Sequence, residues 1–174
     1  MNTIEKLAAA IRVVENFPKP GVSFKDITPI LSDGALFSET MDLFADHFKN
    51  AGITKVVGME ARGFLFAPVI ALKLGAGIVP VRKKGKLPHE TIAETYSLEY
   101  GTDTLEMHRD ALCPADKVLL VDDVLATGGT ASAGRRLAKK LGAQVTAKAC
   151  LIELEFLGGR KKLPGMEVFS LLKY

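Results

Sequence analysis

Two adjacent carboxylates, Asp122 and Asp123, and the short loop of small residues that follows them have the clearest potential for chemistry. Residues 118–121 before them form an unbroken apolar run, which is typical of a strand buried on both faces of a parallel sheet. Open α/β sheets bind ligands at the carboxyl ends of such strands. The loop leads into a helical pattern, and backbone N–H groups at a helix N-terminus bind phosphate readily. This stretch therefore predicts a sugar-phosphate site.

The composition of the loop also favours a phosphate ligand. Its residues are Ala126, Thr127, Gly128, Gly129 and Thr130. The two glycines permit positive φ angles and close approach of a ligand, and the two threonines supply hydroxyl donors. A strand ending in two acids could also be a Walker B element, but the sequence lacks the GxxxxGK[S/T] loop that accompanies one. It also lacks the GxGxxG of a Rossmann site. A purely structural turn would require neither the acids nor the threonines.

Cations follow two other predicted strands. Arg62 follows the strand at residues 55–59, and its guanidinium could bind phosphate oxygens in a bidentate manner or form a surface salt bridge. A basic loop follows the strand at residues 77–81 and contains Arg82, Lys83, Lys84 and Lys86. Such loops are usually only solvated. Here they should lie beside the phosphate loop, so they favour a ligand with more than one phosphate group, such as pyrophosphate.

The composition excludes several functional classes. At 174 residues the chain is expected to form one domain, and 48% apolar with 25% charged residues is ordinary for a soluble globular protein. No apolar run reaches the roughly 18 residues that a membrane-spanning helix requires. A net charge of +3 is too small to indicate nucleic-acid binding. Cys113 and Cys150 lack metal-site spacing, so we expect reduced cysteines and a cytoplasmic location.

The remaining pattern predicts the strands and helices that would position these loops. Apolar residues repeated every three to four positions predict helices, at residues 3–17, 35–50, 64–74 and 131–141. Apolar or alternating runs predict strands, at residues 55–59, 77–81, 118–121, 144–154 and 168–172. Residues 17–29 are rich in proline and predict a stiff irregular segment. The βα alternation is typical of a mostly parallel sheet with helices on both faces.

A further segment predicts a β-hairpin between two of the core strands. Residues 95–100 and 104–108 alternate between apolar and polar around a turn at residues 101–103. The hairpin carries little continuous apolar surface, so it is a plausible mobile lid. An ordinary excursion of the chain is the alternative.

Several separated motifs, in this order, resemble those of the type I phosphoribosyltransferase family, and in particular its adenine-using members. They are Phe17-Pro18-x-Pro20-Gly21, Glu60-Ala61-Arg62-Gly63-Phe64-Leu65-Phe66, Arg82-Lys83-x-Gly85-Lys86-Leu87-Pro88, Tyr96-Ser97-Leu98-Glu99-Tyr100-Gly101, the stretch at residues 118–130, and Leu151-Ile152-Glu153-Leu154. The resemblance covers nearly the full length. It implies one α/β domain over residues 1–174 with a mostly parallel central sheet flanked by helices. It also implies a small base-binding hood at residues 1–34 and a flexible hairpin lid at residues 90–108.

The resemblance implies a reaction and its site residues. The reaction is the Mg²⁺-dependent transfer of the phosphoribosyl group of 5-phosphoribosyl 1-pyrophosphate (PRPP) to adenine, a pentosyltransferase step of purine salvage that yields AMP and pyrophosphate. The implied catalytic residues are Glu99, Asp122, Asp123 and Arg62. The implied substrate-binding residues are Ser23, Phe24, Lys25, Arg82, Lys83, Lys86, Tyr100, Ala126, Thr127, Gly128, Gly129, Thr130 and Leu154. Ser23 and Lys25 are conservative departures from the family pattern, in a segment that reads the base through backbone groups.

The resemblance also implies how cofactor and partners are arranged. Mg²⁺ is expected on PRPP and pyrophosphate, with no direct protein ligand and with Asp122 and Asp123 reaching it through water. A cis peptide is expected at Glu60–Ala61. The implied assembly is a homodimer with the helix after Arg62 at the contact, and neither nucleic acid nor membrane is an expected partner.

Two other functions are compatible with parts of the sequence. One is a sister enzyme for xanthine, guanine or hypoxanthine, because base choice rests on backbone geometry that sequence shows poorly. The other is a regulator that keeps the PRPP site as a sensor. Such regulators usually have an added DNA-binding domain or lack catalytic residues, and neither feature is visible in this sequence.

Overall fold

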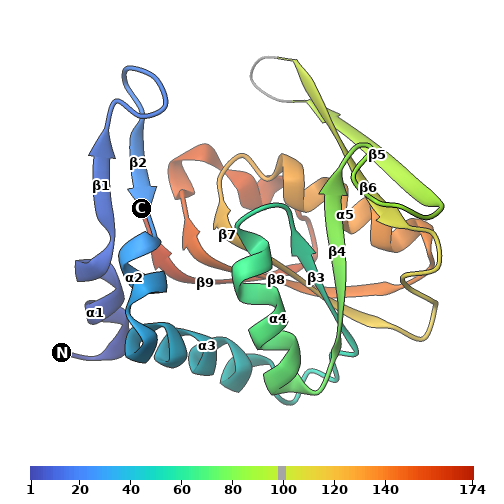
Figure 1. Ribbon diagram of the computed structural model, residues 1–174, viewed down its shortest axis with the longest axis horizontal. Helices are drawn as coiled ribbons and strands as arrows, with labels where there is room; N and C mark the ends of the chain where they lie inside the picture. The colour runs from blue at the N-terminus through green and yellow to red at the C-terminus, as the bar shows by residue number, and fades with distance from the viewer. Residues whose placement is uncertain (98–100) are drawn as a thin grey trace. The chain divides into compact units, whose positions relative to one another are not determined.

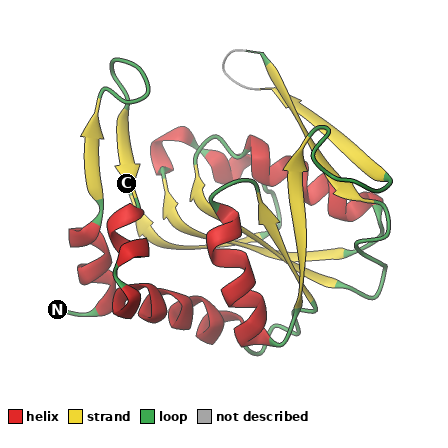
Figure 2. Cartoon of the chain, in the orientation of Figure 1, coloured by secondary structure: helices red, strands yellow, loops and turns green. Residues whose placement is uncertain are grey.

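The computed structural model describes residues 1–97 and 101–174 of the chain. The chain divides into two compact units, residues 1–44 and residues 45–174 (Figure 1). Figure 2 shows that helices dominate the first unit apart from one pair of strands, while the second unit is built on a large sheet. Among the described residues, no helix has the length and apolar character needed to cross a membrane.

The first unit begins with a short helix and a two-stranded ribbon. Its elements are α1 (Thr3–Ala10), β1 (Arg12–Glu15), β2 (Ser23–Asp26), α2 (Thr28–Ser32) and the first part of α3 (Gly34–Phe48). Asn2 and Glu5 cap α1 reciprocally, because each side chain accepts a hydrogen bond from the other's backbone N–H at 2.9 Å. Strands β1 and β2 pair antiparallel, with Val14 opposite Phe24.

The helix predicted over residues 3–17 was wrong beyond Ala10. Val14 matches a helical repeat, but the β-branched side chains of Val13 and Val14 favour a strand, and β2 supplies a partner for it. The irregular segment predicted at residues 17–29 contains that partner strand, and so it was wrong over residues 23–26.

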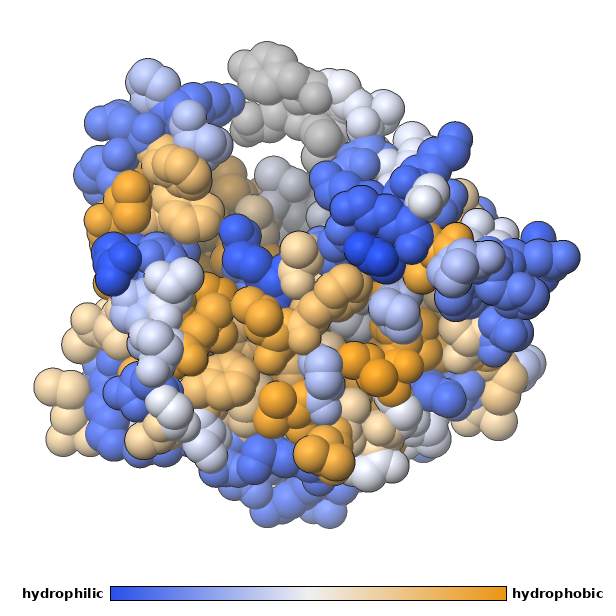
Figure 3. All heavy atoms as spheres, in the orientation of Figure 1, coloured by the Kyte–Doolittle hydropathy of each residue, from blue (hydrophilic) through white to orange (hydrophobic). Residues whose placement is uncertain are grey.

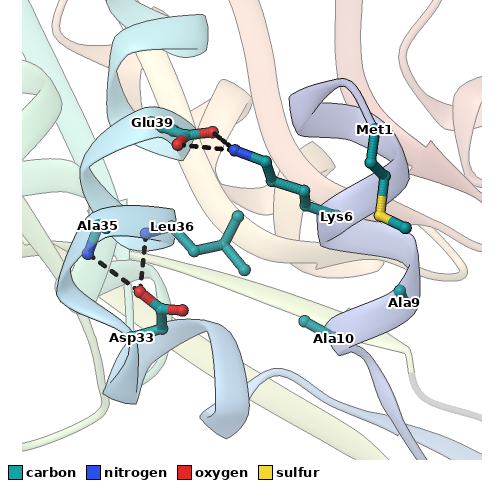
Figure 4. A pocket seen from close by; sticks show the side chains of 8 residues that line it. All are labelled: Met1, Lys6, Ala9, Ala10, Asp33, Ala35, Leu36 and Glu39. Atoms are coloured by element: carbon teal, nitrogen blue, oxygen red, sulfur yellow. Dashed lines mark hydrogen bonds and ion pairs between the residues drawn. The ribbon is translucent and has the colours of Figure 1, made fainter.

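A hollow of about 410 Å³ in the first unit is shown in Figure 4. It is lined by Met1, Lys6, Ala9, Ala10, Asp33, Ala35, Leu36 and Glu39. The charged groups in its wall are paired with one another or with backbone. Lys6 Nζ lies 3.0 Å from Glu39 Oε1, and Asp33 Oδ1 accepts the N–H groups of Ala35 and Leu36 at the start of α3. These contacts join the start of α3 to α1, and we assign the hollow no ligand.

The second unit is organised around a seven-stranded sheet with strand order β5-β6-β4-β3-β7-β8-β9. The strands are β3 (Lys55–Met59), β4 (Gly77–Lys83), β5 (Thr91–Ser97), β6 (Thr102–His108), β7 (Lys117–Leu125), β8 (Gln144–Glu153) and β9 (Glu167–Lys173). The five strands β4, β3, β7, β8 and β9 are parallel, and β5 and β6 form an antiparallel hairpin that continues from β4. The predicted mostly parallel sheet is confirmed. The predicted hairpin is present, but its first strand begins at Thr91 and not at residue 95, and residues 102–103, predicted in the turn, begin β6.

Helices α4 (Gly63–Leu74) and α5 (Gly129–Lys140) cover opposite faces of this sheet. In Figure 1, α4 lies in front of the sheet, against β3, β4 and β7, and α5 lies behind it. The central strand β7 is therefore covered on both sides, and residues 118–121 are at most 1% exposed. Strand β8 was expected to alternate, but residues 147–153 are all buried because it too lies inside the sheet. Cys113 and Cys150 are both free.

Candidate active site

The phosphate loop, residues 126–130, lies between the carboxyl end of β7 and the start of α5. Gly128 caps the helix with a left-handed φ of 77°, a conformation that glycine adopts without steric cost. The loop surrounds a hollow of about 80 Å³, lined by Asp122, Val124, Leu125 and residues 126–131. Backbone N–H groups in the first turn of a helix have no partner within the helix, so this hollow is well suited to an anion.

Asp122 lies at the wall of this hollow, inside β7 and not beyond it as the sequence suggested. The pKa of its carboxyl is raised to about 7, chiefly by burial; the Lys148 ammonium opposes the shift and the nearby Asp123 carboxylate adds to it. Lys148 is fully buried and lies on the neighbouring strand β8. A carboxyl group with this pKa is ready to gain or lose charge near neutral pH when a ligand binds.

This raised pKa predicts how Asp122 affects stability. The unfolded chain ionises Asp122 near pH 3.8, whereas the folded chain does so near pH 7. Between these pH values the folded state therefore binds a proton at Asp122 that the unfolded state has lost. The free energy of unfolding falls progressively as the pH rises through this range. An Asp122→Asn variant should match the wild type at pH 4 and exceed it in thermal stability at pH 8. Melting temperatures of both proteins across this range would test it, and a difference independent of pH would contradict it.

Asp123 is paired with Arg62. Its side chain is 6% exposed, and Arg62 Nε donates to Asp123 Oδ2 at 2.5 Å. The pair forms because β3 and β7 are parallel neighbours, so the loop after β3 reaches the carboxyl end of β7. Gly63 permits this approach, since a Cβ there would lie 2.7 Å from the Val121 carbonyl oxygen. Arg62 therefore lies at the same edge of the sheet as the acidic pair, as expected from the sequence, and its direct contact with Asp123 is a further finding.

Glu60 organises the basic loop after β4. Its carboxylate contacts Lys86 Nζ at 2.6 Å and Arg82 Nε at 3.4 Å, and it accepts the backbone N–H of Lys83 at 2.9 Å. Burial raises the pKa of Glu60, but these donors outweigh it and hold the pKa below its usual range. Glu106, on β6, accepts the backbone N–H of Gly85 at 2.9 Å. Both carboxylates fix the shape of the loop whose basic side chains are predicted to bind pyrophosphate.

The hairpin contacts the phosphate loop through Tyr96. The Thr130 hydroxyl donates to Tyr96 Oη at 3.3 Å, and Tyr96 Oη donates to Asp103 Oδ2 at 3.4 Å. A Cβ on Gly129 would lie 2.9 Å from the Tyr96 ring, so the ring packs directly on the loop backbone. Asp103 in turn pairs with Lys83 at 3.0 Å. These contacts connect the basic loop, the hairpin and the phosphate loop.

Sequence reasoning gave no role to Glu60, Glu106, Asp103 or Tyr96. Glu60 and Tyr96 stand inside motifs that were recognised, so their position was a usable signal. Asp103 and Glu106 act across strand pairs, and only the register of the hairpin against β4 brings them to the basic loop.

The predicted base-binding residues are divided between the units. Ser23, Phe24 and Lys25 lie on β2 in the first unit, where the half-buried Phe24 ring meets Phe17 edge to face at a centroid distance of 5.3 Å. Leu154 lies in the second unit at the end of β8, and its N–H donates to the Leu125 carbonyl at 2.9 Å. Glu99 and Tyr100 lie outside the described residues. The Glu60–Ala61 peptide is cis, so this prediction is confirmed.

The carboxyl ends of the parallel strands β3, β4, β7 and β8 carry most of the predicted site: Arg62, the basic loop, the acidic pair, the phosphate loop and Leu154. The site has an anion pocket, two carboxylates beside it and four cations held by carboxylates. This arrangement suits a sugar that carries phosphate at both ends.

Comparison with known proteins agrees with this geometry. The phosphoribosyl transferase domain family matches residues 27–165. An adenine phosphoribosyltransferase of Desulfitobacterium hafniense is 56% identical over 164 residues, covering 94% of this chain and 95% of that protein. The structure of the Thermoanaerobacter pseudethanolicus enzyme superposes with a TM-score of 0.96 at 47% identity, covering 98% of this chain and 99% of the other.

A third relative was solved with ligands. The adenine phosphoribosyltransferase of Saccharomyces cerevisiae, in complex with an imino-altritol bisphosphate and adenine, superposes with a TM-score of 0.94 at 42% identity and covers 98% of each chain. The chain therefore belongs to the adenine phosphoribosyltransferases, the members of the type I phosphoribosyltransferase family that transfer the phosphoribosyl group to adenine and form AMP in purine salvage.

Proposed function

We propose that residues 126–130 bind the 5′-phosphate of PRPP and that Asp122 and Asp123 hold its ribose hydroxyls. The observation that carries this assignment is the hollow at the start of α5, which is lined by loop backbone on one side and by Asp122 on the other. Backbone N–H groups favour the phosphate dianion, and carboxylates accept hydrogen bonds from hydroxyl groups.

Pyrophosphate is held by Arg62, Arg82, Lys83 and Lys86 in this proposal. Each has a carboxylate near it: Asp123 for Arg62, Asp103 for Lys83, and Glu60 for Arg82 and Lys86. The carboxylates keep the cations at the strand ends and prevent them from repelling one another. An incoming diphosphate, with its higher charge, competes for these cations at the same edge of the sheet.

The residues act on the bond between ribose C1 and pyrophosphate. As this bond breaks, positive charge develops on the ribose ring and negative charge on the leaving group. Asp122 and Asp123 stabilise the positive ring, and Arg62, Lys83 and Lys86 stabilise the departing pyrophosphate. Adenine N9 then forms the new bond to C1 on the opposite face and loses its proton. We assign the handling of that proton to Glu99.

The donor set at this edge suits Mg²⁺. The ion usually binds one or two carboxylates together with substrate phosphates and keeps several waters. Asp122 and Asp123 would hold it through water beside the diphosphate, and among the described residues no cluster of three acidic, histidine or cysteine side chains offers a closed protein site. When bound, Mg²⁺ neutralises charge that develops on pyrophosphate.

We assign adenine recognition to Phe24, which stacks on the base, and to backbone groups of Ser23 and Lys25. Leu154 packs on the opposite side of the base, and Tyr100 moves with the lid at residues 90–108. Phe24 is suited to stacking because its ring is half-buried and already steadied by Phe17. Residues 1–34 form the hood in this proposal. Closing the lid would exclude water from the activated sugar.

A homodimer is the assembly that we propose, in a cytoplasmic protein. Helix α4, which follows Arg62, has apolar side chains on its outer surface: Leu65 is 46% exposed and Leu72 is 82% exposed. Figure 3 shows apolar side chains gathered over this part of the molecule. A second copy of the chain would cover them.

The function predicts a simple turnover pattern. With Mg²⁺ and PRPP, adenine should yield AMP and pyrophosphate, while guanine, hypoxanthine and xanthine should yield nucleotide at less than about one hundredth of that rate, since the site hydrogen-bonds the edge of one base. Release of pyrophosphate and formation of nucleotide would be followed for all four bases. Preference for another base would keep the chemistry and contradict the assignment of Phe24 and its neighbours.

A further inference from the structure

Two glycines face each other behind the phosphate loop. Gly128 belongs to the loop, and Gly159 begins the 3₁₀ helix η2 (Gly159–Lys162). A Cβ on Gly128 would collide with the Gly159 carbonyl oxygen, and a Cβ on Gly159 would collide with the Ala126 carbonyl oxygen and lie 3.1 Å from Gly128 N. The two backbones therefore pack directly, without side chains between them. The position of Gly159 limits the conformations open to the loop.

Gly159 belongs to a short turn, residues 154–160, which we call the bracing turn. It contains the 3₁₀ helix η1 (Glu155–Leu157) and is closed locally by the hydrogen bonds Leu157 N to Leu154 O and Gly158 N to Glu155 O, each 3.0 Å. A further bond, from Lys161 N to Gly158 O at 3.0 Å, spans Gly159. These bonds fix the local shape of the turn, whereas its position relative to the phosphate loop depends on contacts with other elements.

An ion pair joins Glu153, which directly precedes the bracing turn and is buried, to Arg160, which ends the turn and whose side chain is 44% exposed. Glu153, the last residue of β8, is 3% exposed, and Arg160 donates to both of its oxygens: Nε to Oε1 at 2.5 Å and the terminal NH2 group to Oε2 at 2.6 Å. The Ser170 hydroxyl donates to Oε2 at 2.8 Å and orients the carboxylate from β9. Hydrogen bonds from Arg160 hold the pKa of Glu153 below its usual range. Bidentate pairs of this type fix direction as well as distance.

We propose that Glu153 and Arg160 are a positioning pair: they hold Gly159 in contact with the phosphate loop and thereby keep the loop in the conformation that binds the 5′-phosphate. The inference rests on the proposed role of residues 126–130. The loop consists of small side chains that cannot lock it from within, so its geometry depends on what packs behind it. Neither Glu153 nor Arg160 lines the hollow that would hold the phosphate. They act through Gly159.

Two ligands, each of which occupies only one of the proposed anion sites, can distinguish a positioning role from a general effect on folding. Ribose 5-phosphate probes the loop, and pyrophosphate probes the cations at the ends of β3 and β4. In Arg160→Met, we expect the affinity for ribose 5-phosphate and the KM for PRPP to worsen about tenfold or more, because a small displacement of a binding group is costly. Pyrophosphate affinity should stay within about twofold of wild type. Arg160→Lys, which keeps the charge but loses the bidentate geometry, should give an intermediate loss.

Two further variants complete the experiment. Glu155 of the bracing turn forms an ion pair of 2.8 Å with Lys173, the last residue of β9; both side chains are more than half exposed, and neither belongs to a proposed binding group. Lys173→Met is therefore the matched control, with unchanged affinities expected. Gly159→Ala leaves the ion pair in place and moves the loop directly. It should reproduce the loss of affinity for ribose 5-phosphate, and it provides a second test if Arg160→Met fails to fold.

The outcomes are distinct. The positioning role is supported if a variant loses affinity for ribose 5-phosphate but keeps its affinity for pyrophosphate. Arg160→Met should show this result; if it does not fold, Gly159→Ala and Arg160→Lys should both show it. Wild-type affinity for ribose 5-phosphate in these variants, or equal loss of both ligands, overturns it. If the wild type itself binds pyrophosphate but not ribose 5-phosphate, the assignment of the phosphate loop fails, and the inference fails with it.

Discussion

Replacing both carboxylates, in an Asp122→Asn and Asp123→Asn double variant, is expected to lower kcat by a factor of about 10³ while the fold survives. The amides keep the size of the side chains and can still contact the ribose hydroxyls. They cannot supply the negative charge that stabilises the positive ribose ring as its bond to pyrophosphate breaks. The effect should therefore fall on kcat more than on the KM for PRPP. Steady-state kinetics with adenine and PRPP would measure it.

Two control measurements would show that the loss of turnover does not come from unfolding or from loss of pyrophosphate binding. Thermal unfolding should show a folded protein, and the Asp122 change should even favour folding at pH 8, since burial makes the ionised form of this carboxyl unfavourable. Binding of pyrophosphate should persist, because Lys83 and Lys86 are unchanged. Turnover near the wild-type value would remove the acidic pair from the mechanism.

The second unit could be predicted well from the sequence because local signals and tertiary structure agree there. Residues 118–121 are an apolar run, and β7 is covered by α4 on one face and by α5 on the other. Parallel strands place their carboxyl ends at one edge, so the loops after β3, β4 and β7 could be expected to meet before any coordinates were known. Arg62 and Asp123 meet for this reason.

The first unit was predicted less well because its local signals conflict. Ile11 and Val14 continue the helical repeat of residues 4–8, yet the chain leaves the helix at Ala10 and pairs Val14 with Phe24. That pairing joins residues on either side of a loop with two prolines, and no local pattern encodes its register. Tertiary pairing outweighed a weak helical preference.

The partners of the site residues were the hardest to predict. The basic residues after β4 are plain in the sequence, but the carboxylates that hold their loop come from two other parts of the chain: Glu60 precedes α4, and Asp103 and Glu106 lie on β6. Asp103 and Glu106 reach the loop through the antiparallel register of β6 against β4, where Arg82 stands opposite Glu106, whereas Glu60 reaches it because β3 and β4 are parallel neighbours. Sequence patterns indicate which face a side chain occupies, but not which residue stands opposite it.

Arg62 links the stability of the protein to its chemistry, and two variants should separate these effects. Arg62→Met is expected to lower kcat about a hundredfold, because a cation that stabilises the leaving pyrophosphate is removed. It should also destabilise the fold by about 1–3 kcal/mol, because it leaves the buried Asp123 carboxylate without the donor that lies 2.5 Å from it. Chemical denaturation and steady-state kinetics would measure the two losses.

Adding Asp123→Asn to Arg62→Met should restore most of the stability, because the double variant has no unpaired buried charge at this position. It should not restore turnover, since both the leaving-group cation and one of the ribose carboxylates are then absent. Stability would rise while turnover stays low, as expected if the unpaired buried charge and the loss of catalysis have separate causes. Recovery of both together would mean that Arg62 serves only to neutralise Asp123, and the pyrophosphate would then have to be held by the basic loop alone.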